Sequence, residues 1–260
     1  MRQCERENIE RIEVVGKWLL LRLAEKASSK RDIYLRNAIA KNISLIRSIE
    51  LLFEKGQFNQ GYILFRSLLD RLVYIYYLND NNLFDTFEEW SFIKSYEHRH
   101  NAKADERFRK VLDDPLFKSI PTESRRYSEL KAANIAWEKP DPKTVLKKRG
   151  MDFLYKFGYD YASMHTHPMA SDGDLEFHQL TGLEPNPHKD FKYDELSLNS
   201  LLISTLLMQE ILNALSFKFM KILYDLLDEM RKEINNHQNN CKETFYKIVI
   251  LISNKEPLFT

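Results

Sequence analysis

Proline placement constrains the fold of this chain more than any other feature. All eight prolines occur at position 115 or later, so residues 1–114 contain none, and residues 188–256 contain none either. Proline breaks helix interiors because it lacks a backbone N–H and its ring clashes with the preceding turn. Glycine is also scarce, with seven among 260 residues, and no window shows the apolar–polar alternation that is typical of strands. The sequence therefore predicts an all-α protein.

Apolar residues recur at helical spacing through the proline-free stretches. They predict helices at about Glu5–Lys26, Ile33–Lys55, Asn59–Leu78, Leu83–Leu112, Glu195–Asn235 with a break near Ser216, and Thr244–Ile252. A further helix begins near Pro142 and ends near His167, because Pro168 disfavours the helical conformation of the residue before it. We therefore expect one domain over residues 1–260, a bundle of about seven or eight helices, with an irregular excursion at about 113–142.

Composition and charge favour a soluble cytoplasmic protein. The net charge is +1, from 39 basic and 38 acidic residues, which argues against a strongly basic DNA-coating protein but leaves room for a local basic patch. The two cysteines, Cys4 and Cys241, are too few for a disulfide scaffold. The charged N-terminus has no apolar segment like that of a secretory signal, and no apolar window reaches the length of a membrane span. We expect no membrane partner.

The third predicted helix is apolar on nearly all sides, so it should lie centrally. Arg66 and Asp70 interrupt it four residues apart, a spacing at which an ion pair forms on one helix face. Buried charges are rare unless they are paired. Two interpretations follow: a structural ion pair, or an arginine aimed at a phosphate with Asp70 orienting it.

The stretch Gly158–His178 holds three of the seven histidines together with several acidic residues. Tyr159, Ser163 and His167 are four residues apart and line one face of a helix. At the helix end His167 meets a partial negative charge that favours a protonated imidazole, and imidazole exchanges protons near neutral pH. The candidate site therefore uses Arg66 to bind a phosphate, His167 as acid or base, and Tyr159 and Ser163 to orient the ligand.

The same stretch also offers ligands for a divalent metal. His165, Asp172, Asp174 and His178 supply imidazole and carboxylate groups, which suit such ions. A metal-dependent hydrolase that uses this cluster is therefore one alternative function.

The segment Arg231-Lys-Glu-Ile-Asn-Asn-His237 is similar to the Arg-x4–6-His motif of HEPN toxins, which are small helical bundles. In that family the arginine holds the scissile phosphate of RNA and the histidine handles protons without a metal. The resemblance implies a ribonuclease in which Arg231 and His237 have these roles. Lys232 departs from the pattern, because Asn, His or Asp is commoner there.

A second resemblance covers more of the chain, from about Tyr62 to Pro168. The segment F-R-S-L-L-D, which contains Arg66, and the motif Tyr159-x3-Ser163-x3-His167-Pro168 resemble an uncharacterised bacterial all-helical family. Its members carry an R-S-L-L-E-like helix and a Y-x3-S-x3-H-P-like helix end, and some lie near phage-defence genes. The resemblance implies an all-α fold and a pocket shared by the two motifs, with Asp replacing the usual Glu.

These observations lead to two expectations from different classes. In the first, the chain is a HEPN-like ribonuclease or toxin in a defence role, with RNA as its partner. It then needs no cofactor, whereas the alternative hydrolase would bind a divalent metal. In the second, it is a non-enzymatic helical interaction module with a second copy (a homodimer) or another protein as partner. In this module Arg66, Asp70, Tyr159, Ser163 and His167 form a buried network in which each polar group has a hydrogen-bonding partner. The substitution Arg66→Ala separates the two expectations.

Overall fold

The computed structural model describes residues 3–26, 29–104, 121–167, 173–184, 195–215, 220–236, 238, 245–246 and 250. Every regular element in these ranges is helical, which confirms the all-α prediction. The α-helices are α1 Gln3–Lys26, α2 Lys30–Glu54, α3 Phe58–Asn81, α4 Phe84–Ala104, α5 Pro121–Ala132, α6 Pro142–Lys148, α7 Asp152–Leu154, α8 Tyr161–Met164, α9 Asp174–Thr181, α10 Glu195–Ala214 and α11 Met220–Asn235. A π-helix, Tyr155–Asp160, joins α7 to α8.

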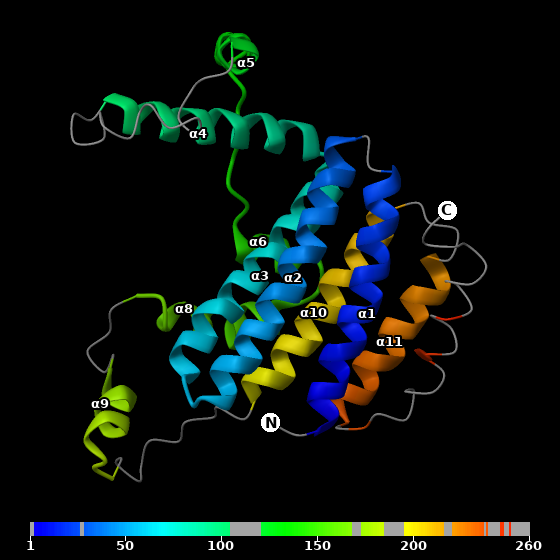
Figure 1. Cartoon of the computed structure of the whole chain (residues 1–260), viewed down its shortest axis with the longest axis vertical. Coiled ribbons are helices and arrows are strands. Elements are labelled where there is room, and N and C mark those ends of the chain that lie inside the picture. The colour runs from blue at the N-terminus through cyan, green and yellow to red at the C-terminus, as the bar shows by residue number, and fades with distance from the viewer. Residues whose placement is uncertain are drawn as a thin grey trace. The chain divides into compact units, whose positions relative to one another are not determined.

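The chain divides into two compact units, one of residues 1–77 with 140–260 and one of residues 78–139. In the larger unit α1 packs against α2 and α10, and α10 packs against α2 and α11 (Figure 1). Helix α10 is buried on most of its surface, including polar side chains such as Ser200, Ser204 and Gln209. Ser29 begins α2 by accepting the Asp32 N–H at 3.0 Å, which satisfies a backbone donor at the helix start.

Two glycines allow close approach of neighbouring helices in this unit. A Cβ added to Gly16 of α1 would collide with Ile43 of α2, and one added to Gly61 of α3 would collide with Leu196 of α10. The absence of side chains at these two positions brings α1 against α2 and α3 against α10.

The smaller unit is held together by aromatic contacts between α4 and α5 and the residues that follow. Tyr96 stacks on Tyr127 with ring centroids 4.3 Å apart, and Trp137 lies 4.7 Å from the Phe87 ring. Arg126 donates to the Glu88 carboxylate at 2.6 and 2.8 Å. Of the excursion predicted at 113–142, α5 forms a regular part, and residues 113–120 lie outside the described residues.

The predicted bundle of about seven or eight helices is roughly right in number, but the helix predicted from Pro142 to His167 is broken. Helix α6 ends at Lys148, and Gly150 then adopts a φ of +69°. This left-handed conformation commonly ends a helix, and glycine adopts it most readily. Three short elements follow, and α8 ends at Met164 rather than at His167. Helix α9, between Gly173 and Gly182, was not predicted.

Two further expectations concern the chain ends and the membrane. The last predicted helix, Thr244–Ile252, falls mostly outside the described residues. Within the ranges that the structure describes, none of the helices combines the length and the apolar character that crossing a membrane requires.

Candidate functional site

Helix α3 presents Arg66 and Asp70 on a half-buried face. The neighbouring residues Phe65, Leu68 and Leu69 are buried and fix the helix against the core. Because Arg66 and Asp70 are one turn apart, their side chains meet, and Arg66 Nη1 forms an ion pair with Asp70 Oδ2. The predicted pair therefore exists.

The π-helix Tyr155–Asp160 carries Tyr159 to Arg66. A π-helix closes its hydrogen bonds over five residues rather than four, which shifts the direction of the side chains that follow, and such segments often occur at functional sites. Ser163 lies in the next helix, α8, and its Oγ donates to the Tyr159 carbonyl at 2.7 Å. Tyr159 and Ser163 are thus on one side of the backbone, as their spacing predicted.

Arg66, Asp70, Tyr159 and Ser163 form one polar cluster, here called the Arg66 network. Arg66 Nε donates to Ser163 Oγ at 2.8 Å, and Arg66 Nη2 donates to the Tyr159 hydroxyl. That hydroxyl donates in turn to Asp70 Oδ1 at 3.0 Å. The guanidinium carbon also lies 3.3 Å from the centroid of the Tyr159 ring, a cation–π contact. Residues about ninety positions apart in the chain therefore hold one arginine in a fixed orientation.

The Arg66 network is partly open to solvent. The Arg66 side chain is 16% exposed, whereas that of Asp70 is 38% exposed. Burial, together with the Asp70 carboxylate, raises the pKa of Tyr74, which lies one turn further along α3. The Arg66 nitrogen that faces Asp70, Nη1, is inaccessible to solvent, so an anion reaches it only by displacing the Asp70 carboxylate.

His167 lies beyond the end of α8 and is exposed. The helix closes early because the N–H groups of His165 and Thr166 bond to carbonyls three residues back, those of Ala162 and Ser163. His167 therefore leaves the helix face that Tyr159 and Ser163 share. Among the residues described, no hydrogen bond or ion pair joins His167 to the Arg66 network.

His165, a predicted metal ligand, packs instead among aromatic rings. Its ring stacks on Tyr62 with centroids 4.8 Å apart, and Tyr161 meets both rings edge-on at 5.1 and 5.3 Å. Burial raises the pKa of Tyr161. Tyr62 and Tyr161 were missed in the sequence, although Tyr62 stands one turn before Arg66 and Tyr161 one turn before His165.

The other predicted metal ligands have separate roles where they are described. His178 Nδ1 lies 3.1 Å from the Leu183 carbonyl at the end of α9, and Asp174 stands in the first turn of that helix. The described part of the chain contains no group of three or more His, Cys, Asp or Glu side chains that could hold a metal ion. Asp172 lies outside that part, so the metal alternative stays a prediction.

The HEPN-type arginine of α11, Arg231, donates to Gln209 Oε1 and to Asp228 Oδ1. Its predicted partner His237 is outside the described residues. This pair therefore also stays a prediction.

Comparison with known proteins adds one family. Residues 32–180, more than half of the chain, match the model of a family described as "Family of unknown function (DUF5677)". The match contains all of the Arg66 network and His167, whereas Arg231 and His237 lie outside it. No curated protein and no solved structure matches the chain.

Proposed function

The chain belongs to this family of unknown function, DUF5677, and we propose that it is a HEPN-like ribonuclease that cleaves RNA without a metal. In this proposal Arg66 binds the scissile phosphate and His167 moves the proton. The biological role would be that of a toxin or defence protein. The observation that carries the proposal is the convergence of Tyr159, Ser163 and Asp70 on the Arg66 guanidinium.

A fixed guanidinium suits phosphate binding because its planar donors match two phosphate oxygens at once. The Arg66 network removes the rotational freedom that an arginine side chain otherwise loses on binding, so less entropy is lost when the ligand arrives. Because Nη1, the nitrogen paired with Asp70, is inaccessible to solvent, a phosphate that binds there must displace the Asp70 carboxylate.

His167 follows α8 by less than one helical turn and is exposed, so it is accessible to a bound RNA strand. Metal-independent cleavage of RNA transfers the phosphoryl group from the 5′-oxygen of the next nucleotide to the ribose 2′-oxygen. The 2′-hydroxyl loses a proton and the leaving oxygen gains one, so an imidazole that can accept and donate a proton can serve the reaction. Arg66 would neutralise the charge that develops on the phosphate oxygens.

A specific observation favours the non-enzymatic interaction module as second candidate. Each nitrogen of the Arg66 guanidinium already has a partner within the protein: Nε has Ser163, Nη1 has Asp70 and Nη2 has Tyr159. An arginine held by two hydrogen bonds and one ion pair fastens α3 to α8 and the π-helix. In that case the network is structural, and a protein partner or a second copy would bind elsewhere.

RNA cleavage by the purified protein decides between the candidates. Single-stranded RNA is incubated with the wild-type chain, with and without chelator, beside His167→Ala and the matched control His98→Ala, which removes another exposed histidine. The proposal expects cleavage that survives the chelator, is retained by the control and is lost in His167→Ala. Cleavage that the chelator abolishes contradicts it and supports the metal alternative. Absence of cleavage by a folded wild-type chain leaves the interaction module.

Variants of Arg66 provide the second criterion. Arg66→Lys keeps the charge but loses the planar donors, so a phosphate-binding role predicts loss of cleavage in a folded protein. For Arg66→Ala, a purely structural role predicts a fall in the free energy of unfolding of about 2 kcal/mol, because the hydroxyls of Tyr159 and Ser163 lose the arginine as hydrogen-bonding partner.

A further inference from the structure

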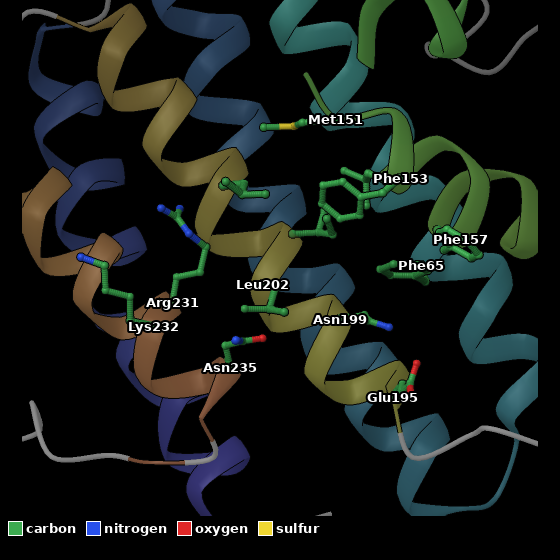
Figure 2. A pocket seen from close by; sticks show the side chains of 14 residues that line it. Phe65, Met151, Phe153, Phe157, Glu195, Asn199, Leu202, Arg231, Lys232 and Asn235 are labelled. Carbon is green, nitrogen blue, oxygen red and sulfur yellow. The ribbon is translucent and has the colours of Figure 1, made fainter. Parts of the chain in front are cut away.

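The larger unit contains a pocket of about 570 Å³ between α10, α11 and the segment that runs from Met151 into the π-helix (Figure 2). Its volume falls within the range of roughly 300–1,000 Å³ that is usual for small-molecule sites. Apolar side chains make most of its wall: Phe65, Met151, Leu154, Leu202, Ile203 and Leu206. None of the four residues of the Arg66 network lines it, so the pocket is a separate site.

The apolar wall comes from two helical faces that neighbouring helices do not cover fully. Leu202 and Leu206 are one turn apart on α10 and are half-buried, in a helix whose other apolar residues are almost all buried. Phe153 and Phe157 stand four residues apart beside the pocket and are 64% and 77% exposed. Large apolar side chains grouped around a concave site mark a place where an apolar ligand is covered.

The polar residues of the pocket are separated by charge. Arg231, Lys232 and Asn235 come from α11, whereas Glu195 and Asn199 come from the first two turns of α10. Figure 2 shows Arg231 and Lys232 on one side of Leu202 and Glu195 on the other. The pocket therefore has a cationic end and an acidic end with apolar wall between them.

The cationic end lines the pocket with two cations, whereas the carboxylates near them do not line it. Arg231 and Lys232 both pair with Asp228, the lysine at 2.8 Å, and Glu229 also lies near Lys232. The Lys232 side chain is 71% exposed and can turn toward a ligand. An anionic group is attracted to this end and repelled from Glu195, which gives a bound molecule one orientation.

We propose that the pocket binds a hydrophobic carboxylate. Its carboxylate lies beside Lys232 and Asn235 of α11, and its apolar part lies along Leu202 and Leu206 toward Phe65. Phe153 and Phe157 cover the apolar part at the rim. This inference is independent of the proposed ribonuclease activity, because it uses a different set of side chains.

Isothermal titration with decanoate, and with decanol as its uncharged counterpart, tests the proposal on the full chain. We expect saturable binding of one decanoate per chain. Decanol should bind about fivefold more weakly, the upper end for a partly exposed ion pair. Leu202→Trp fills the pocket and should abolish binding, whereas Leu51→Trp, at an exposed leucine of α2 that does not line the pocket, should not.

A charge variant separates recognition of the carboxylate from simple apolar binding. Lys232→Met keeps most of the side-chain stem and should weaken decanoate about fivefold while leaving decanol unchanged. The matched control Lys17→Met, at another exposed lysine, should change neither affinity.

Three results would overturn the proposal. The first is no saturable binding of decanoate by the folded wild-type chain, and the second is undiminished binding by a folded Leu202→Trp. The third is equal affinity for decanoate and decanol together with no effect of Lys232→Met. Thermal unfolding followed by circular dichroism establishes that each variant is folded. If Leu202→Trp does not fold, the affinities of Lys232→Met for decanoate and decanol still test the proposal.

Discussion

Tyr159→Phe tests the geometry of the Arg66 network most sharply, because it removes a single oxygen and keeps the ring. The lost hydroxyl donates to Asp70 Oδ1 at 3.0 Å and accepts from Arg66 Nη2. The phenylalanine ring retains the cation–π contact with the guanidinium. The measured loss therefore reports on the two hydrogen bonds alone.

Exposure decides the magnitude of that loss. Water can replace the hydroxyl at Asp70, whose side chain is 38% exposed, but replaces it poorly at Arg66, whose side chain is 16% exposed. One buried donor without its partner costs about 2 kcal/mol. We expect urea denaturation, followed by far-UV circular dichroism, to show this fall in the free energy of unfolding.

The matched control is Tyr155→Phe, which alters a half-buried tyrosine of the same π-helix. It should change the free energy of unfolding by less than about 0.5 kcal/mol. If Tyr159→Phe costs no more than this control, the hydroxyl does not link Arg66 to Asp70, and the network argument fails.

Two further predictions concern how α6 is held. Asp141 accepts the Thr144 N–H at 3.0 Å, and hydrogen bonds from the Thr144 hydroxyl and N–H hold the pKa of Asp141 below its usual range. Asp141→Ala should therefore cost about 1 kcal/mol at neutral pH, and Asp141→Asn less. Because the pKa of Asp141 is lowered in the folded state, the stability difference between wild type and Asp141→Asn should be complete above about pH 4. This difference should be lost as pH falls through the folded-state pKa of Asp141. A difference in melting temperature that persists at pH 2 contradicts this. Arg149→Met removes the 3.2 Å ion-pair partner of the Glu210 carboxylate, which is only 7% exposed, and should lower the free energy of unfolding by about 3 kcal/mol. The control Arg125→Met, at an exposed ion pair, should lower it by less than about 0.5 kcal/mol. Equal losses of the two variants in chemical denaturation would refute this reasoning.

The long helices could be predicted from sequence because their signals are local. Without proline, and with apolar residues at a helical period, residues 5–26, 33–55 and 59–78 have few alternatives to helix. Helices α1, α2 and α3 cover these ranges except Lys55, which caps the end of α2. The pair Arg66–Asp70 was predictable for the same reason, since one turn of helix brings the two side chains together.

The elements that shape the site depend on contacts that no local pattern reports. The π-helix has no sequence signature in this chain, yet it turns Tyr159 toward α3. The early end of α8 removes His167 from the face that a continuous helix would have given it. His165 was read as a metal ligand because of its acidic neighbours, but its ring partner Tyr62 lies on α3, far away in the chain. The pocket was missed because its wall is built from α10, α11 and residues 151–158 together.

The Arg66 network and the pocket both use α3 and the π-helix, but substitutions can test each of them separately. Phe65 and Arg66 are adjacent on α3, and so are Gly158 and Tyr159 on the π-helix; in each pair the first residue lines the pocket and the second belongs to the Arg66 network. A change in α3 or the π-helix therefore disturbs both sites. Leu202 and Lys232 lie on α10 and α11 and line the pocket alone, whereas Ser163 belongs to the network alone. Loss of decanoate binding in Leu202→Trp with unchanged RNA cleavage would establish two independent sites, and loss of both would mean that the shared α3 and π-helix couple them.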